Sequence, residues 1–123
     1  MLVHGREVKF FRSVGAVNEI AKACPGGDIS KLTDQLQSNN TIVVNDTWAT
    51  FISALNEGYE QAQKYEDPTY KPNPLTVAEL YTLTEEDFYK LIGEASEAWF
   101  GDKRLVEVEE SKGKKNETSE TSD

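Results

Sequence analysis

Apolar residues recur at helical spacing along much of this chain, and the longest such pattern begins at Asn45 or Asp46. Residues three and four positions apart share one face of a helix, so a repeating apolar set of this kind marks a buried stripe. Gly58 interrupts the pattern and costs about 1 kcal/mol of helix propensity relative to alanine. The pattern still predicts one long helix, with a buried stripe made of Trp48, Phe51, Ile52, Leu55, Tyr59 and Ala62.

Capping signals predict two further helices in the second half of the chain. Thr76 and Glu79 have the spacing of a capping box, in which each side chain accepts a hydrogen bond from the other residue's backbone N–H. Thr84 and Asp87 repeat the arrangement with aspartate in place of glutamate. The first signal opens a short helix and the second a longer one that is expected to end near Gly101. The stripe of the longer helix is Phe88, Leu91, Ile92, Ala95 and Trp99.

Two shorter helices are predicted nearer the start of the chain. Ser13 is a suitable cap for a helix that ends at about Cys24, since Pro25-Gly26-Gly27 follows. The apolar positions expected on its buried face are Val14, Val17, Ala21 and Cys24. Asp28 or Ser30 then caps a short helix that runs through Ile29, Leu32 and Leu36.

Residues 41–44, Thr-Ile-Val-Val, leave two alternatives open. The run is rich in β-branched side chains, which favours a short strand. A lone run of four residues is equally consistent with an extended linker that buries Ile42 and Val44.

The first residues have the alternating pattern of a half-buried β-hairpin, with Gly5-Arg6 as the turn. The expected fold class is therefore mainly α: a small helical domain of about five helices with a short N-terminal β-hairpin. This single domain is expected to span residues 1–104. Residues 105–123 carry many charges and almost no apolar side chains, so we expect a disordered C-terminal tail that keeps the protein in solution.

Composition narrows the classes of partner. The formal net charge is −9 at pH 7, which disfavours binding to nucleic acid or to anionic membranes. No stretch approaches the roughly 20 apolar residues of a membrane span, and the first residues lack the pattern of a signal peptide. We therefore expect a cytoplasmic protein, in which the single cysteine, Cys24, is reduced and partly buried.

The sequence contains no recognisable catalytic, cofactor-binding or metal-binding constellation. The single histidine, His4, adjoins the predicted turn and is expected to be exposed. Glu85-Glu86-Asp87 fits the start of a helix, where the helix dipole stabilises negative charge. Gly26-Gly27 lacks the lysine and glycine spacing of a phosphate-binding loop. We therefore expect a protein that is not an enzyme and has no cofactor.

Two segments are candidates for binding another protein. Trp99 and Phe100 are adjacent and cannot share one helix face, so Phe100 either begins a chain reversal or is exposed to a partner. The segment from Glu66 to Leu75 contains three prolines and is either a plain connector or a pre-ordered contact surface. The candidate partner-binding residues are Tyr65, Tyr70, Pro72, Trp99 and Phe100.

The layout as a whole resembles the tail assembly chaperones of long-tailed (siphovirus-type) bacteriophages. The resemblance rests on the opening Val3–Phe10 with Ser13–Ala16, on Leu83–Phe88, and on the lysine-bearing end. It implies a chaperone that keeps the tape-measure protein soluble in the cytoplasm of the bacterial host until the major tail protein polymerises around it. Such a chaperone would bind apolar helices weakly at many places, which predicts self-association or several copies per client.

The family resemblance also implies a short product and a longer product made by −1 ribosomal frameshifting. Lys114-Lys115-Asn116 permits the slippery heptamer A AAA AAC, and Lys112-Gly113-Lys114 permits G GGA AAA. The alternative from another class is an adaptor or regulatory domain that binds one folded partner stoichiometrically through the Tyr65–Leu75 loop.

Overall fold

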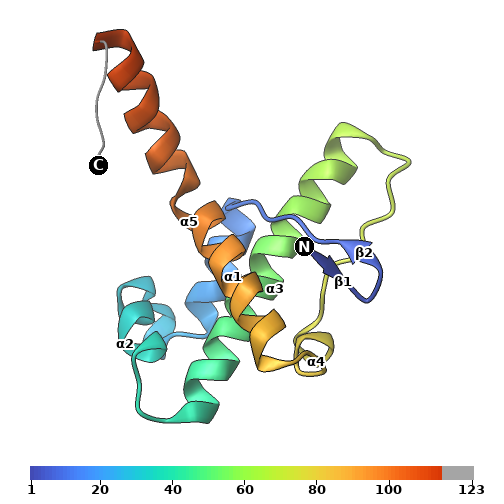
Figure 1. Cartoon of the computed structure of the whole chain (residues 1–123), viewed down its shortest axis with the longest axis vertical. Helices are drawn as coiled ribbons and strands as arrows, with labels where there is room; N and C mark the ends of the chain where they lie inside the picture. The colour runs from blue at the N-terminus through green and yellow to red at the C-terminus, as the bar shows by residue number, and fades with distance from the viewer. Residues whose placement is uncertain (115–123) are drawn as a thin grey trace.

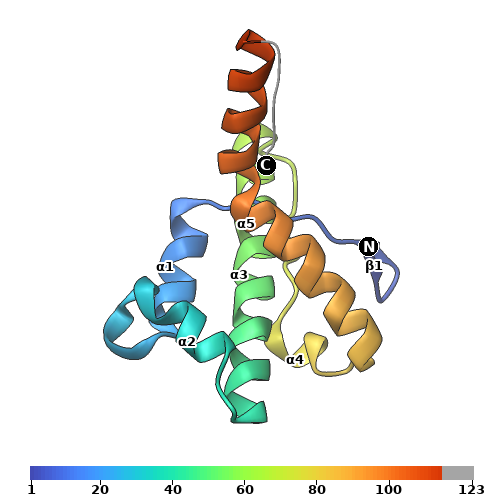
Figure 2. The same cartoon turned by 60° about the vertical axis from the view of Figure 1, so that its left-hand side comes forward.

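A long central helix, α3 (Thr41–Glu66), organises the computed structural model of this chain. The structure describes residues 1–114, with side chains described up to Gly101. Helices α1 (Val14–Lys22) and α2 (Leu32–Leu36) pack on one side of α3, and α4 (Val77–Leu80) and α5 (Glu85–Lys114) on the other (Figures 1 and 2). Two short 3-10 turns, η1 (Pro25–Gly27) and η2 (Ile29–Lys31), connect α1 to α2. The described chain is thus mainly helical with five α-helices, as predicted.

The N-terminal β-hairpin is also confirmed, although its turn lies elsewhere than predicted. Strand β1 (Leu2–Val3) pairs antiparallel with β2 (Arg6–Glu7), with Val3 opposite Arg6. The turn residues are therefore His4 and Gly5, and the predicted Gly5-Arg6 turn is wrong by one residue. His4 has φ 50° and Gly5 has φ 84°, and two positive values in succession mark a type I′ turn, whose twist matches that of paired strands.

Helix α1 is capped as predicted but presents a different face to the core. The Ser13 hydroxyl accepts a hydrogen bond from the Ala16 N–H at 3.0 Å. Ala16, Ile20 and Cys24 are buried at a spacing of four residues, whereas Val14 is 79% exposed. The expectation that Val14 belongs to the buried stripe is therefore wrong. In the first turn of α1, the small residue Ala16 lies against α3, beside Gly58.

Residues 41–44 form neither a strand nor a linker, because α3 begins at Thr41. The Asn40 side chain accepts hydrogen bonds from the Ile42 and Val43 N–H groups and so caps the helix one turn before the expected start at Asn45 or Asp46. Ile42 is exposed, which also contradicts its predicted burial. Asp28 caps the short helical segment before α2 by accepting from the Ser30 N–H, one of the two predicted alternatives.

The core lies around the middle of α3 and confirms most of the two long stripes. Phe51, Ile52 and Leu55 of α3 are buried, and so are Phe88 and Leu91 of α5. The Phe51 ring contacts the Trp48 ring edge-on and the Trp99 ring at a tilted angle, with ring centroids 5.4 and 5.2 Å apart. Such aromatic contacts add to the stability that burial alone provides.

Helix α5 is longer than the sequence predicted. It continues through Gly101, the expected end, to Lys114, and its last turns extend away from the other helices (Figure 1). The first part of the predicted tail, residues 105–114, forms these last turns of α5, for which only the backbone is described. The remainder of that tail, residues 115–123, lies outside the described part of the chain.

Candidate functional site

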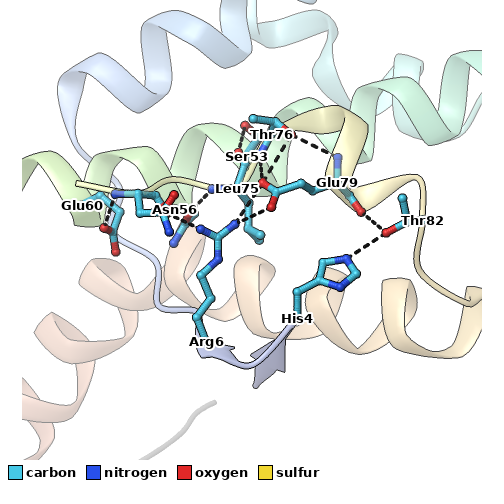
Figure 3. Close-up of polar contacts among 10 residues, drawn as sticks. His4, Arg6, Ser53, Asn56, Glu60, Leu75, Thr76, Glu79 and Thr82 are labelled. Carbon is cyan, nitrogen blue, oxygen red and sulfur yellow. Dashed lines mark hydrogen bonds and ion pairs between the residues drawn. The ribbon is translucent and has the colours of Figure 1, made fainter. Parts of the chain in front are cut away.

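Buried polar side chains on α3 fasten the two irregular segments of the chain to the domain (Figure 3). The Asn56 side-chain amide donates to the Lys9 carbonyl at 2.8 Å, and its oxygen accepts from the Leu75 N–H at 2.7 Å. Asn56 is only 2% exposed, so it satisfies two backbone groups that would otherwise lack partners. One residue thus ties both the N-terminal segment and the loop before α4 to α3.

Glu60, one helical turn further along α3, performs the same role for the loop of residues 67–76. Its carboxylate accepts a hydrogen bond from the Tyr70 hydroxyl at 2.8 Å and one from the Asn73 N–H at 2.9 Å. The hydrogen bond to Glu60 raises the pKa of the Tyr70 phenol above its ordinary value. The loop is therefore a fastened segment rather than a free one, and the Tyr70 hydroxyl already has an internal partner.

The hairpin is held to α4 by a second polar cluster, also visible in Figure 3. The Arg6 guanidinium donates to both carboxylate oxygens of Glu79 at 2.9 Å and to the Asn73 carbonyl at 2.8 Å. His4 is exposed, and its Nε2 is hydrogen-bonded to the Thr82 hydroxyl at 2.9 Å. The pKa of Glu79 lies below its ordinary value, mainly because its carboxylate accepts a hydrogen bond from the Thr76 N–H and also because the positively charged Arg6 is close. Together these contacts position the turn that leads from α4 into α5.

The structure separates the predicted partner-binding residues into two regions. Tyr65 lies at the end of α3 and is 90% exposed, while Tyr70 and Pro72 are half-buried in the following loop. Trp99 packs on Phe51, which is fourteen residues before Tyr65 on α3. At 1.5 Å per residue, fourteen residues span about 21 Å of helix. The five residues therefore do not form one surface.

At the second region, Trp99 has a structural role and its neighbour Phe100 is exposed. The Arg12 guanidinium lies 4.0 Å above the Trp99 ring centroid and donates to the Trp99 carbonyl at 2.9 Å. Phe100 lies within α5 and is 53% exposed. Of the two alternatives for Phe100, the structure therefore places it on the solvent side of the helix rather than at a chain reversal.

A pocket that the sequence did not indicate lies where the start of α3, α4 and the start of α5 meet. Its volume is about 130 Å³, and it is open to solvent. Its lining is mixed: Leu80, Leu83 and Phe88 contribute apolar atoms, Tyr81 and Tyr89 contribute rings and hydroxyls, and slightly more of the accessible lining is polar than apolar. Both tyrosines are exposed. The available signal was the pair Phe88-Tyr89, which has the same character as Trp99-Phe100, because adjacent aromatic residues cannot both face the core.

The surroundings of this pocket, which we call the α4–α5 pocket, are acidic. The Tyr81 hydroxyl donates a hydrogen bond to the Asp46 carboxylate of α3. Partial burial and this hydrogen bond raise the pKa of Tyr81 to about 12, so the phenol stays protonated. Glu85, at the first position of α5, contributes to the lining. The arrangement suits an apolar group with a positive charge nearby.

A second cavity, of about 200 Å³, lies between α1 and α3. Its lining is mostly small side chains, including Gly15 and Gly58, together with the carboxylates Glu19 and Glu57. Gly58 permits the close approach there, since a Cβ at this position would lie 2.5 Å from the Phe11 carbonyl oxygen. The cavity therefore has a structural explanation: small side chains, which the close contact between α1 and α3 requires, leave space beside that contact.

The remaining chemical candidates have structural explanations. Cys24 is buried and its thiol donates to the Ile20 carbonyl at 3.6 Å, and burial raises its pKa, which disfavours a nucleophilic thiolate. Within residues 1–101, no group of three or more histidine, cysteine or acidic side chains is arranged to hold a metal ion. No helix in the described part of the chain combines the length and apolar character needed to cross a membrane.

Comparisons with known proteins found no match: no family model, no curated protein and no solved structure is significantly similar to this chain.

Proposed function

We propose that this chain is a tail assembly chaperone of a long-tailed bacteriophage, acting in the host cytoplasm without catalysis. Its client would be the tape-measure protein, a long helical polypeptide that must stay soluble until the major tail protein polymerises around it. The proposal combines the sequence resemblance with one observation on the structure. That observation is the pair of exposed tyrosines in the lining of the α4–α5 pocket, Tyr81 and Tyr89, with exposed Ile42 three residues before the lining residue Asn45 on α3.

Large apolar side chains are expensive to leave in water, and burying one contributes about 1.5–3 kcal/mol. Elsewhere in the fold, the polar side chains of Asn56, Glu60 and Arg6 are all hydrogen-bonded, so the packing there is complete. Two exposed tyrosines in the lining of a partly apolar pocket therefore favour a contact surface over incomplete packing. Tyrosine suits such a surface because it provides a large contact area at a small cost in side-chain entropy.

A chaperone of this kind needs weak and repeated contacts. A small pocket that accepts one apolar side chain gives modest affinity at a single site, so the client is released when tube subunits displace it. Binding of several copies along one client supplies avidity without permanent attachment. The acidic net charge of −9 would then keep the coated client dispersed, because like-charged complexes repel one another.

The proposal predicts that a tape-measure protein is encoded beside this gene, and co-expression with that protein tests it. We expect the client to move from the insoluble to the soluble fraction when this chain is present, and to co-purify with several copies of it. A client that remains equally insoluble with and without the chain would refute the chaperone function. The gene offers a second test: the absence of both slippery heptamers and of an overlapping −1 frame would count against the frameshifted product.

The adaptor alternative depends on the Tyr65–Leu75 loop. Tyr65 is available for a partner, being almost fully exposed. Tyr70, in contrast, already donates a hydrogen bond to Glu60, so this tyrosine of the loop stabilises the fold and its hydroxyl is not available to a partner. A titration against a purified partner separates the two functions, since saturation at one copy per partner favours the adaptor.

A further inference from the structure

The α4–α5 pocket has the size of a single apolar side chain. A dry cavity of about 150 Å³ admits a benzene-sized group, so a volume of about 130 Å³ matches one side chain of about the size of leucine. Leu80 and Phe88 are themselves buried and held by the core. The pocket is therefore preformed, and its occupant would pay little to organise it.

Ile42 extends the apolar surface beyond the pocket. It precedes Asn45 by three residues and Asp46 by four on α3, so it is a neighbour of each of them on the helix surface. Asn45 lines the pocket and Asp46 accepts the Tyr81 hydrogen bond, which places Ile42 beside the mouth. Ile42 is 71% exposed. An occupant that contacts the Asn45 side of the pocket thus has a second apolar contact, Ile42, one turn earlier on α3.

Carboxylates dominate the charge around the mouth. Asp46 and Glu85 adjoin the pocket, and Glu86 and Asp87 follow in the first turn of α5. The nearby cation Lys90 lies 3.8 Å from Glu86 and offsets one of these charges. The remaining excess is negative, so an occupant with lysine or arginine beside its apolar side chain is complementary in charge.

We propose that the α4–α5 pocket binds a basic amphipathic helix, which inserts one large apolar side chain into the pocket and places a lysine or arginine beside Glu85 and Asp46. Helix-in-groove recognition presents apolar anchors at positions i and i+3 or i+4, which matches the separation of the pocket from Ile42. The identity of this helix as part of the client rests on the proposed function. The existence of the pocket, its charge and the chemistry of the ligand that it prefers do not depend on the proposed function.

Two synthetic peptides of about 18 residues test the proposal on the full chain by calorimetry. Both carry leucines on one helix face, and the other face carries lysines in the first peptide and glutamates in the second. We expect the lysine peptide to bind and the glutamate peptide to bind at least about tenfold more weakly. Equal affinity for the two peptides, or no binding of the lysine peptide, would overturn the charge assignment.

Four single variants locate the binding. Tyr89→Ala removes an exposed ring at the mouth and Glu85→Lys reverses a charge in the lining; each is expected to weaken binding about tenfold. Their matched controls are Tyr65→Ala and Glu57→Lys, which make the same changes at exposed residues away from the pocket. The controls are expected to change affinity less than about twofold. Equal effects of Glu85→Lys and Glu57→Lys would mean that the peptide responds to net charge alone, and equal effects of Tyr89→Ala and Tyr65→Ala would mean that it does not contact the mouth of the pocket; either result would overturn the proposal.

Two outcomes separate this inference from its neighbours. If Ile42→Ala, which leaves the core intact, dissociates a self-associated protein that binds no peptide, the occupant is a second copy and the proposal fails. If the wild-type chain solubilises the tape-measure protein and Tyr89→Ala does so equally well, the pocket inference fails and the chaperone function stands. Peptide binding at the pocket without solubilisation of the client gives the converse result.

Discussion

Replacing Gly58 with alanine should destabilise this protein, although the same change stabilises most helices. Gly58 is buried in α3, where the segment before α1 crosses it. An added Cβ would lie 2.5 Å from the Phe11 carbonyl oxygen and 2.9 Å from the Ser13 Oγ. Neither atom is free to move, because the Phe11 N–H donates to the Leu55 carbonyl at 2.9 Å and Ser13 caps α1.

The expected magnitude follows from the two ways in which the chain can respond. If both contacts stay, the crowded site carries overpacking strain of about 1–3 kcal/mol. If the segment moves away by roughly 1 Å, it weakens the Phe11 hydrogen bond and the Ser13 cap, at about 1 kcal/mol each. Either response costs about 2 kcal/mol, and the gain in helix propensity returns about 1 kcal/mol. We therefore expect the free energy of unfolding to fall by about 1 kcal/mol.

Gly93 provides the matched control, because it also lies inside a helix but is exposed. A Cβ added there meets no atom within 4 Å, so Gly93→Ala should raise the free energy of unfolding by up to about 1 kcal/mol. Urea unfolding monitored by circular dichroism measures both variants on one scale. Stabilisation by both substitutions would refute the close approach at Gly58, and destabilisation by both would refute the propensity argument.

Three further predictions test the fold. Glu60→Ala should lower the free energy of unfolding by about 2–3 kcal/mol in urea titrations, since two donors lose their acceptor, and Tyr70→Phe by only about 1 kcal/mol. Glu79 has a lowered pKa, so its stabilising contribution is present above its ordinary value of 4.5 and is lost as the pH falls through the lower folded-state value. Glu79→Gln should accordingly flatten the fall in stability below about pH 4.5, and an unchanged slope would contradict the lowering of the Glu79 pKa by the Thr76 N–H and by Arg6. Ile20→Ala should cost about 2–5 kcal/mol and Val14→Ala almost nothing, and the reverse order would restore the α1 face predicted from sequence.

The parts of the fold that sequence predicted are those encoded by local interactions. Ser13, Thr76 and Thr84 each accept a hydrogen bond from a backbone N–H three residues later, as expected. A cap needs only its own turn of helix, so its residue pattern is sufficient evidence. The long stripes of α3 and α5 were predictable for a similar reason, since many apolar positions at one spacing outweigh any single exception.

The errors arose where tertiary context outweighs a short local signal. Four β-prone residues at 41–44 join α3 because Asn40 caps it and the following helix extends cooperatively into them. In α1, nine residues permit two overlapping faces, and close packing against Gly58 selects the face with Ala16. The hairpin turn shifted by one residue because two successive positive φ values fit the strand twist better than the predicted type II′ turn.

The candidate site could not be predicted from the sequence because its residues lie outside the apolar stripes of α3 and α5. Asn56 and Glu60 look like solvent-facing positions of α3, yet both are buried by segments that the sequence gives no reason to place there. Tyr81 and Tyr89 have the opposite character, apolar rings that remain outside. Pattern analysis assigns polar residues to water and apolar residues to the core, so it misses exceptions of both kinds, which are the residues that a site requires.

The position of the two kinds of exception along α3 has a physical consequence. The buried polar residues Asn56 and Glu60 lie in the second half of the helix, where they fasten the N-terminal segment and the loop. The exposed apolar residue Ile42 and the α4–α5 pocket lie at its beginning. The loop that Glu60 fastens leads directly into α4, so the same hydrogen bonds that stabilise the fold also hold one wall of the pocket in place. A loss of Glu60 should therefore weaken peptide binding at a pocket it does not touch.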